Sequence, residues 1–169
     1  MGFNSGPPLL PGGYNQNLQL FQTSDYVVIL NEMVHDARIV PLDGRPHLPG
    51  QIKQWMGDAR GRWDGDTLVV ETTNFTSKTA SFNPTVASAM GTGETLHVTE
   101  RFSRPNARTL LYEYTVDDRT TFARPIKAAI HLKKSDEPMY EYACHEGNYG
   151  LLNILRGARA AEGAVKESR

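Results

Sequence analysis

Residues 60–75 constrain the fold more than any other stretch of the chain, because they predict a tight β-hairpin. One predicted strand ends at Trp63, Asp64-Gly65 makes the turn, and a second strand follows directly. An Asp-Gly pair between β-prone runs is a strong hairpin signal, since a type I′ turn needs positive φ at both central residues. The second strand is rich in β-branched residues, yet it carries a carboxylate, Glu71, at its centre. The hairpin therefore predicts a β-rich chain and makes Glu71 a candidate functional residue.

Short β-prone runs recur along the rest of the chain. They predict strands at residues 17–22, 26–33, 37–41, 95–102, 109–117, 122–133 and 139–144. Residues 149–165 place leucine, isoleucine and alanine at helical spacing, which predicts one C-terminal helix. Sequential short strands favour an antiparallel meander, which removes its edges by closing into a barrel. We therefore expect a mainly β protein, namely a calycin- or lipocalin-like barrel with one C-terminal helix; a β-sandwich is the alternative.

The chain of 169 residues is expected to form one domain in three parts. These are an irregular arm rich in Gly and Pro at 1–16, the barrel at 17–147, and a helix at 148–169 that packs on the barrel. The net charge is −1 and the charges are interspersed, which argues against nucleic acid or an anionic membrane as a partner. We expect a small-molecule ligand or substrate as the partner, and a homo-oligomer stays open.

Acid–base chemistry is the most specific function that the residue types suggest. A carboxylate turned into the barrel would have its pKa raised by desolvation and could act near neutral pH. Glu71 is preferred because its strand is otherwise the most apolar. His35 and His145 lie at predicted strand ends, where a barrel cavity opens, and imidazole suits proton transfer. These three are the predicted catalytic residues. Glutamates on a solvated outer face and histidines that pin turns are the structural alternative.

Four further residues are predicted to bind the substrate. Arg38 would hold an anionic group, because a guanidinium binds carboxylates with two hydrogen bonds. Tyr112 shares one strand face with Tyr114 and would line the pocket with aromatic surface. Asn74 and Glu141 complete the predicted binding set.

No organic cofactor is expected. His35, His47 and His145 could form a three-ligand metal centre, although no His-x-His or His-Glu-x-x-His spacing supports one. The favoured interpretation is a cofactor-independent lyase, isomerase or hydrolase that acts on a partly aromatic or apolar substrate. A non-catalytic carrier of a small apolar ligand, a metal-dependent barrel enzyme, and a structural or partner-binding module are the alternatives, since a fold alone does not decide function.

Four motifs carry a resemblance to known proteins: EMVHDAR at 32–38, PLDGRPH at 41–47, GRWDGDTLVVETTNF at 61–75 and YEYACHEGN at 140–148. Over nearly its whole length the chain resembles a large bacterial family whose members are mostly described as hypothetical. Its members are often longer at the N-terminus and carry an export signal. The resemblance implies a bacterial source and a periplasmic or secreted location, and it implies no activity. Residues 1–6 lack the features of a signal peptide and look like the beginning of a mature or trimmed chain, from which an export signal could have been removed. A cytoplasmic location also stays open.

Overall fold

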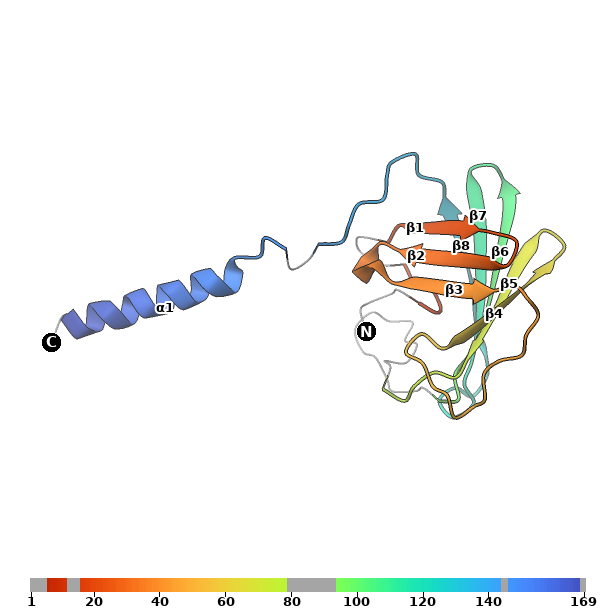
Figure 1. Ribbon diagram of the computed structural model, residues 1–169, viewed down its shortest axis with the longest axis horizontal. Helices are drawn as coiled ribbons and strands as arrows, with labels where there is room; N and C mark the ends of the chain where they lie inside the picture. Colours follow the sequence, from red (N-terminus) through yellow and green to blue (C-terminus); the bar gives the residue numbers. More distant parts are fainter. Residues whose placement is uncertain (1–5, 12–15, 79–93, 144–145, 168–169) are drawn as a thin grey trace.

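The structure, a computed structural model, describes residues 6–11, 16–78, 94–143 and 146–167 (Figure 1). Its strands form two antiparallel sheets. The first sheet contains, in order, β1 (Leu18–Gln22), β2 (Tyr26–Asn31) and β3 (Ala37–Pro41). The second contains, in order, β4 (Asp58–Asp64), β5 (Thr67–Thr73), β6 (His97–Asn106), β7 (Thr109–Asp117) and β8 (Ile126–Lys133). The described chain also forms a short 3-10 helix, η1 (Met33–His35), and a C-terminal helix, α1 (Gly150–Glu167).

The predicted mainly β fold, with antiparallel sheets and one C-terminal helix, is confirmed. Within each sheet every strand pairs with its neighbour in sequence. In the described part of the chain no strand pairing joins β3 to β4 or β1 to β8, so hydrogen bonds do not close the sheets into a barrel. The connection 42–57 runs between the two sheets and contributes a single isolated bridge, from Gln54 to Phe75.

The two sheets face each other across one hydrophobic core. Val27 and Ile29 of β2 and Val40 of β3 enter this core from the first sheet at every second position. The second sheet contributes Val70, Val98, Tyr112 and Val116. This alternation is typical of strands that bury one face, and burial of that face selects the register of each strand.

Gly61 of β4 lies where the first sheet comes close to the second. A Cβ atom added at this position would stand 2.7 Å from Val40 Cγ1 and 2.7 Å from Leu42 Cδ2. Real Cβ atoms essentially never make contacts so short, so any other residue would force the side chains of Val40 and Leu42, or the two strands, to shift. The glycine therefore permits the close approach of β3 and β4.

We predict that Gly61→Ala lowers the free energy of unfolding by about 1–3 kcal/mol, because its methyl group overpacks the contact with Val40 and Leu42. Urea denaturation followed by circular dichroism measures the change. Gly50→Ala is the control, since an added Cβ there meets nothing within 4 Å. Equal stability of the two variants would contradict the close packing of the sheets at β4.

The predicted β4–β5 hairpin is confirmed, but its turn lies one residue later than the sequence predicts. Asp64 pairs with Thr67, so Gly65 and Asp66 are the two central residues of the turn. Gly65 has a φ of 57°, whereas Asp66 keeps an ordinary φ. Only the first central residue of a type II′ turn needs positive φ. The later register therefore assigns the left-handed conformation to glycine and avoids forcing Asp64 into it.

Residues 6–11, which belong to the predicted N-terminal arm, form no helix or strand but pack into the body of the protein. Pro7, Pro8 and Leu9 are buried, and Leu9 belongs to the hydrophobic cluster between the sheets. Leu9 is therefore part of the core, and Leu10 packs against it.

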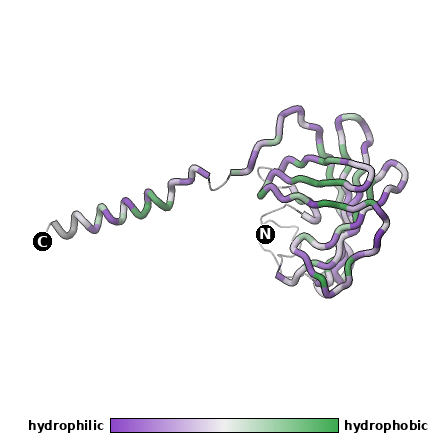
Figure 2. The backbone as a smooth tube through the Cα atoms, in the orientation of Figure 1, coloured by the Kyte–Doolittle hydropathy of each residue, from purple (hydrophilic) through white to green (hydrophobic). Residues whose placement is uncertain are grey.

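The C-terminal part differs from its prediction in two ways. Residues 139–143 form no strand, although aromatic residues alternate there, so β8 is the last strand of the described residues and lies at an edge of its sheet. The helix α1 forms as predicted, but the expected packing on the barrel is not observed. It extends away from the sheets (Figure 1), and residues 150–163 are exposed. Figure 2 shows hydrophobic residues along its first half. Helical spacing predicts an apolar stripe but does not identify the surface that covers it.

No helix in the described part of the chain combines the length and the hydrophobicity needed to cross a membrane.

A buried aspartate, Asp118, organises the turn between β7 and β8. Its Oδ1 accepts hydrogen bonds from the hydroxyls of Thr95 at 2.8 Å and Thr120 at 2.7 Å, and from the backbone N–H of Thr120 at 3.1 Å. Its Oδ2 accepts from the hydroxyl of Thr121 at 3.2 Å. Burial alone would raise the pKa of Asp118, but these donors outweigh it and hold the pKa below its ordinary value.

We predict that the free energy gained from the Asp118 carboxylate depends on pH. Because the folded-state pKa lies below the unfolded value of about 3.9, the contribution is fully present above that value and is lost as pH falls through the folded pKa. Asp118→Asn should therefore be less stable than the parent by about 1–3 kcal/mol at pH 7, and this difference should shrink toward pH 2. Urea denaturation of both proteins across this range measures the difference, and a difference that is constant with pH would contradict the assignment.

Candidate functional site

A buried ion pair joins the two sheets. The side chains of Arg38 on β3 and Glu100 on β6 are 3% and 0% exposed. Arg38 Nη1 donates to Glu100 Oε2 at 2.6 Å, and Nη2 donates to Oε1 at 2.9 Å. Such paired hydrogen bonds between guanidinium and carboxylate are strong and fix the relative orientation of the two groups. The pair therefore fixes β3 relative to β6.

Tyr112 of β7 extends this network to the N-terminal segment. Its hydroxyl donates to Glu100 Oε1 at 2.8 Å and accepts from the backbone N–H of Leu9 at 2.8 Å. Its ring packs against Phe102 and Tyr114, with centroid distances of 4.9 and 5.6 Å. One chain of hydrogen bonds thus connects both sheets and the segment that contains Leu9.

Burial and the ion pair together determine the protonation of this network. Burial alone would lower the pKa of Arg38, but the charge and hydrogen bonds of Glu100 outweigh it and raise the pKa above its ordinary value. Burial, and then the negative charge of Glu100, raise the pKa of Tyr112 well above its ordinary value. Arg38 therefore stays charged and Tyr112 stays protonated, so both donate to Glu100.

Arg38 was predicted to hold an anionic group of a substrate, and in the structure the anion is Glu100. Each of the two terminal nitrogens of Arg38 donates to an oxygen of Glu100. Among the described residues its Nε has no hydrogen-bond partner. The structure thus gives Arg38 a role in joining the sheets.

The prediction that Glu71 turns inward is wrong. Its side chain is 43% exposed on the outer face of β5, with Oε1 3.7 Å from Arg62 Nη2. Glu100 of β6 is instead a carboxylate that turns into the core, and the sequence contained a signal for it. Val98 and Phe102 stand two positions away on either side of Glu100, so all three share the buried face of β6.

The structure describes two of the three predicted catalytic residues and places one beside the first sheet and the other on the second. His35 is exposed at the end of η1, in the connection between β2 and β3, with a φ of 46°. Glu71 lies on the outer face of the other sheet. His145 lies outside the described residues.

Within the described ranges, no group of three or more His, Cys, Asp or Glu is arranged to hold a metal ion. His47, one of the three predicted metal ligands, lies with its Nδ1 2.9 Å from Oδ2 of the buried Asp58. Arg60 Nη1 lies 2.7 Å from the other oxygen of Asp58. This cluster anchors the connection 42–57 to the start of β4.

The remaining predicted binding residues have different surroundings. Asn74 has a φ of 59°, and its Nδ2 donates to the carbonyl oxygen of Leu48 at 2.9 Å, which also anchors the connection 42–57. Glu141 is exposed in the segment after β8. Tyr112 differs from both, because it lines a pocket between the edges of the two sheets.

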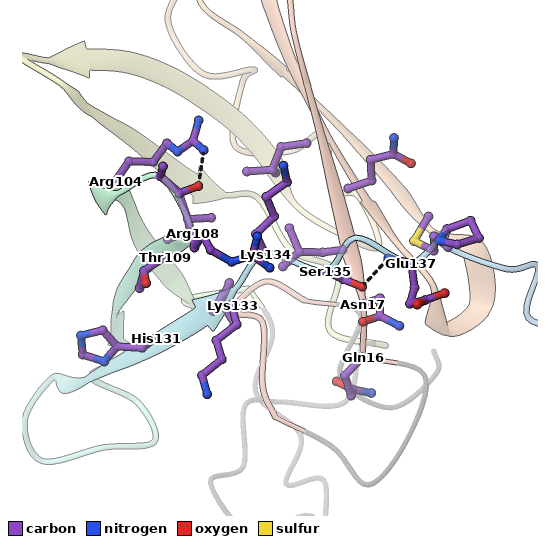
Figure 3. A pocket seen from close by; sticks show the side chains of 18 residues that line it. Gln16, Asn17, Arg104, Arg108, Thr109, His131, Lys133, Lys134, Ser135 and Glu137 are labelled. Atoms are coloured by element: carbon purple, nitrogen blue, oxygen red, sulfur yellow. Dashed lines mark hydrogen bonds between the residues drawn. The ribbon is translucent and has the colours of Figure 1, made fainter.

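A groove lies between these edges, where β1 of the first sheet faces β7 and β8 of the second (Figure 3). Its outer part has a volume of about 660 Å³ and is lined by 16–20, the β6–β7 hairpin and 131–135. An inner pocket of about 150 Å³ is lined by the segment around Leu9, by Ile130 and by Tyr112. The two parts share Gln16, Asn17, Leu18 and Leu132. We call them together the β1–β8 groove.

The β1–β8 groove combines apolar and cationic side chains. Leu18 and Leu20 of β1 and Leu132 of β8 are half-buried and supply apolar surface. Four cationic residues lie along the outer part, namely Arg104, Arg108, Lys133 and Lys134. Figure 3 shows the two arginines on the β6–β7 hairpin, with Gln16 and Asn17 at the start of β1 on the other side. This lining can hold an elongated molecule with an apolar body and a polar or anionic end.

Sequence reasoning did not identify the groove. Alternating apolar residues in β1 and β8 predict strands with one buried face, and in a closed barrel these residues would be ordinary core. That β1 and β8 are unpaired edge strands follows only from the strand order of the two sheets, which the sequence pattern does not give.

Comparison of the chain with models of known protein families, with curated proteins and with solved structures finds no match. The function must therefore be inferred from the geometry of the chain itself.

We predict that the buried pair shows strong energetic coupling. Arg38→Met and Glu100→Gln should each lower the free energy of unfolding by about 3–5 kcal/mol, because each leaves a buried charge without its partner. The double variant should lose much less than the sum of the two, since no unpaired charge remains. A double-mutant cycle from urea denaturation measures the coupling.

The exposed pair Arg101–Asp64, with a distance of 3.0 Å and side chains 40% and 56% exposed, is the matched control. Its coupling should stay below about 1 kcal/mol. Additive losses for the Arg38 and Glu100 variants would show that the two side chains do not interact in the core.

Proposed function

We propose that the protein binds a small, largely apolar molecule in the β1–β8 groove. The observation that carries this proposal is that half-buried leucines of two edge strands, Leu18 and Leu20 of β1 and Leu132 of β8, line a shared groove while they also pack against the hydrophobic core. Edge strands of natural β proteins are usually charged, short or covered. An apolar opening between two such edges fits a bound ligand, which would cover the exposed leucine surface.

The dimensions and lining of the groove support this proposal. Its outer volume of about 660 Å³ falls within the usual range for ligand pockets, about 300–1,000 Å³. Most ligand sites combine apolar walls with a few polar groups that fix orientation, and Gln16 and Asn17 lie at the junction of the two parts of the groove. The apolar end of the ligand would enter the inner pocket, toward the ring of Tyr112.

We further propose that the two sheets form an incomplete barrel of the calycin kind. One pair of edges, β3 and β4, approaches closely at Gly61, and the other pair, β1 and β8, is separated by the groove. The interior of an eight-stranded barrel has room for side chains or for about one small ligand. Here Leu9, Tyr112 and the ion pair occupy the space between the sheets, so the ligand site would lie in the opening.

The geometry supports binding better than the acid–base enzyme that the sequence favours. His35 and Glu71 line neither part of the groove. Arg38 is bonded to Glu100 and is buried. The non-catalytic carrier, an alternative from the sequence, needs only an apolar site of suitable size.

We predict that N-phenyl-1-naphthylamine, a neutral fluorescent probe, binds saturably in the β1–β8 groove. Leu132→Trp should weaken binding by about tenfold or more, because the larger ring fills the junction of the outer and inner parts. Ile39→Trp is the matched control, since Ile39 is 63% exposed on the outer face of β3. Fluorescence titration measures the affinity, and circular dichroism checks that both variants fold.

The exposed leucine and isoleucine side chains of α1 offer the probe a second surface. Ile154→Gln/Leu155→Gln removes part of that surface and should leave binding unchanged. Binding that survives Leu132→Trp but is lost in the helix variant would contradict the proposal, and so would the absence of saturable binding.

A further inference from the structure

Cationic side chains concentrate at one end of the β1–β8 groove. Arg104 and Arg108 come from the β6–β7 hairpin, and Lys133 and Lys134 come from the end of β8 and the residue after it (Figure 3). The chain as a whole has a net charge of −1, so this end is positive in a slightly negative protein. Glu137 also lines the outer part of the groove, so its lining holds four cationic side chains and one carboxylate. A cleft with an excess of one sign of charge attracts ligands of the opposite sign.

Backbone hydrogen bonds hold two of these cations side by side. The backbone N–H of Lys134 donates to the carbonyl oxygen of Arg108 at 2.9 Å, and Thr109 pairs with Lys133 across β7 and β8. Arg108 and Lys134 therefore sit on neighbouring, paired backbone segments. Because these backbone segments are already ordered, a ligand that binds both charges does not have to pay for ordering the backbone.

Asp136 shows that these two cations bind a carboxylate. Arg108 Nη2 donates to Asp136 Oδ2 at 2.8 Å, and Lys134 Nζ lies 3.9 Å from Asp136 Oδ1. All three side chains are largely exposed, at 66%, 59% and 65% for Arg108, Lys134 and Asp136. Exposed ion pairs contribute little to stability, so another carboxylate can replace Asp136 at low cost.

We propose that the ligand of the β1–β8 groove is an amphiphilic carboxylate, whose anionic head binds Arg108 and Lys134 in place of Asp136. This inference rests on the proposed function of the groove. The apolar chain of the ligand lies along Leu18 and Leu132 and enters the inner pocket. Arg108 and Lys134 thus set specificity for the head group, and the leucines supply the apolar contact.

The test compares dodecanoate with dodecanol, which has the same chain and no charge. Both are titrated below the concentration at which they aggregate, by displacement of N-phenyl-1-naphthylamine from the intact protein. Dodecanoate should bind about threefold to tenfold more tightly than dodecanol at low salt, and the preference should decrease as salt is added. Arg108→Gln/Lys134→Gln should abolish the preference, because it weakens the binding of dodecanoate far more than that of dodecanol.

Two further variants sharpen the test. Asp136→Asn removes the competing carboxylate and should raise the affinity for dodecanoate several-fold, with no effect on dodecanol. Arg101→Gln removes an exposed arginine that pairs with Asp64 outside the groove and should change neither affinity.

The outcomes separate this inference from the proposed function. If both molecules displace the probe with equal affinity, or if the preference survives Arg108→Gln/Lys134→Gln, the head-group inference is overturned while the groove remains a binding site. If neither molecule displaces the probe from a protein that binds it, the inference of an amphiphilic carboxylate is overturned, and the Leu132→Trp comparison still decides whether the groove is a binding site.

Discussion

The buried ion pair between Arg38 and Glu100 is the interaction on which the arrangement of the two sheets depends. The cost of taking two charges out of water is offset only when geometry is good and the remaining polar atoms are satisfied. The paired hydrogen bonds and the donation from Tyr112 largely meet this condition, although Arg38 Nε has no partner among the described residues. A sliding movement of one sheet over the other would break the pair and leave both charges buried. The network therefore favours one relative placement of the sheets.

That placement positions the groove. Glu100 and Tyr112 lie on β6 and β7, and Tyr112 also binds the backbone of Leu9, so the N-terminal segment is held between the sheets. Gly61 permits close approach at the β3–β4 edges, whereas the β1–β8 edges stay apart. The buried network thus fixes the inner end of a groove whose outer part is lined by cationic side chains, and we propose that these two parts form a site for an amphiphilic molecule.

Much of the fold could be predicted from the sequence because local signals agree. Residues 60–75 form the predicted hairpin, the sheets are antiparallel, and α1 begins close to where the apolar spacing begins. The sequence also pointed to inward ionisable groups, but the choice of Glu71 over Glu100 was wrong. The choice used the average hydrophobicity of the strand. A side chain lies on the same face of a strand as the residues two positions before and after it. For Glu100 these residues are Val98 and Phe102, and both are buried.

The candidate site could not be predicted because it depends on contacts between segments far apart in the chain. No local pattern shows that Glu100 is the partner of Arg38, 62 positions earlier. Likewise, leucines on β1 and β8 have the same alternation whether their strands pair or stand apart. Helical spacing in α1 also predicts an apolar face without identifying what it contacts. In each case the missing information was the identity of the neighbour in space.

The most direct test of the β1–β8 groove as the ligand site is a methyl NMR titration with dodecanoate. The methyl resonances of Leu18, Leu20, Ile130 and Leu132, which line the groove, should shift in a saturable manner. Those of Ile39 on the outer face of β3 and Leu151 on α1 should not. Shifts confined to α1 or to the outer faces of the sheets would contradict the assignment of the groove.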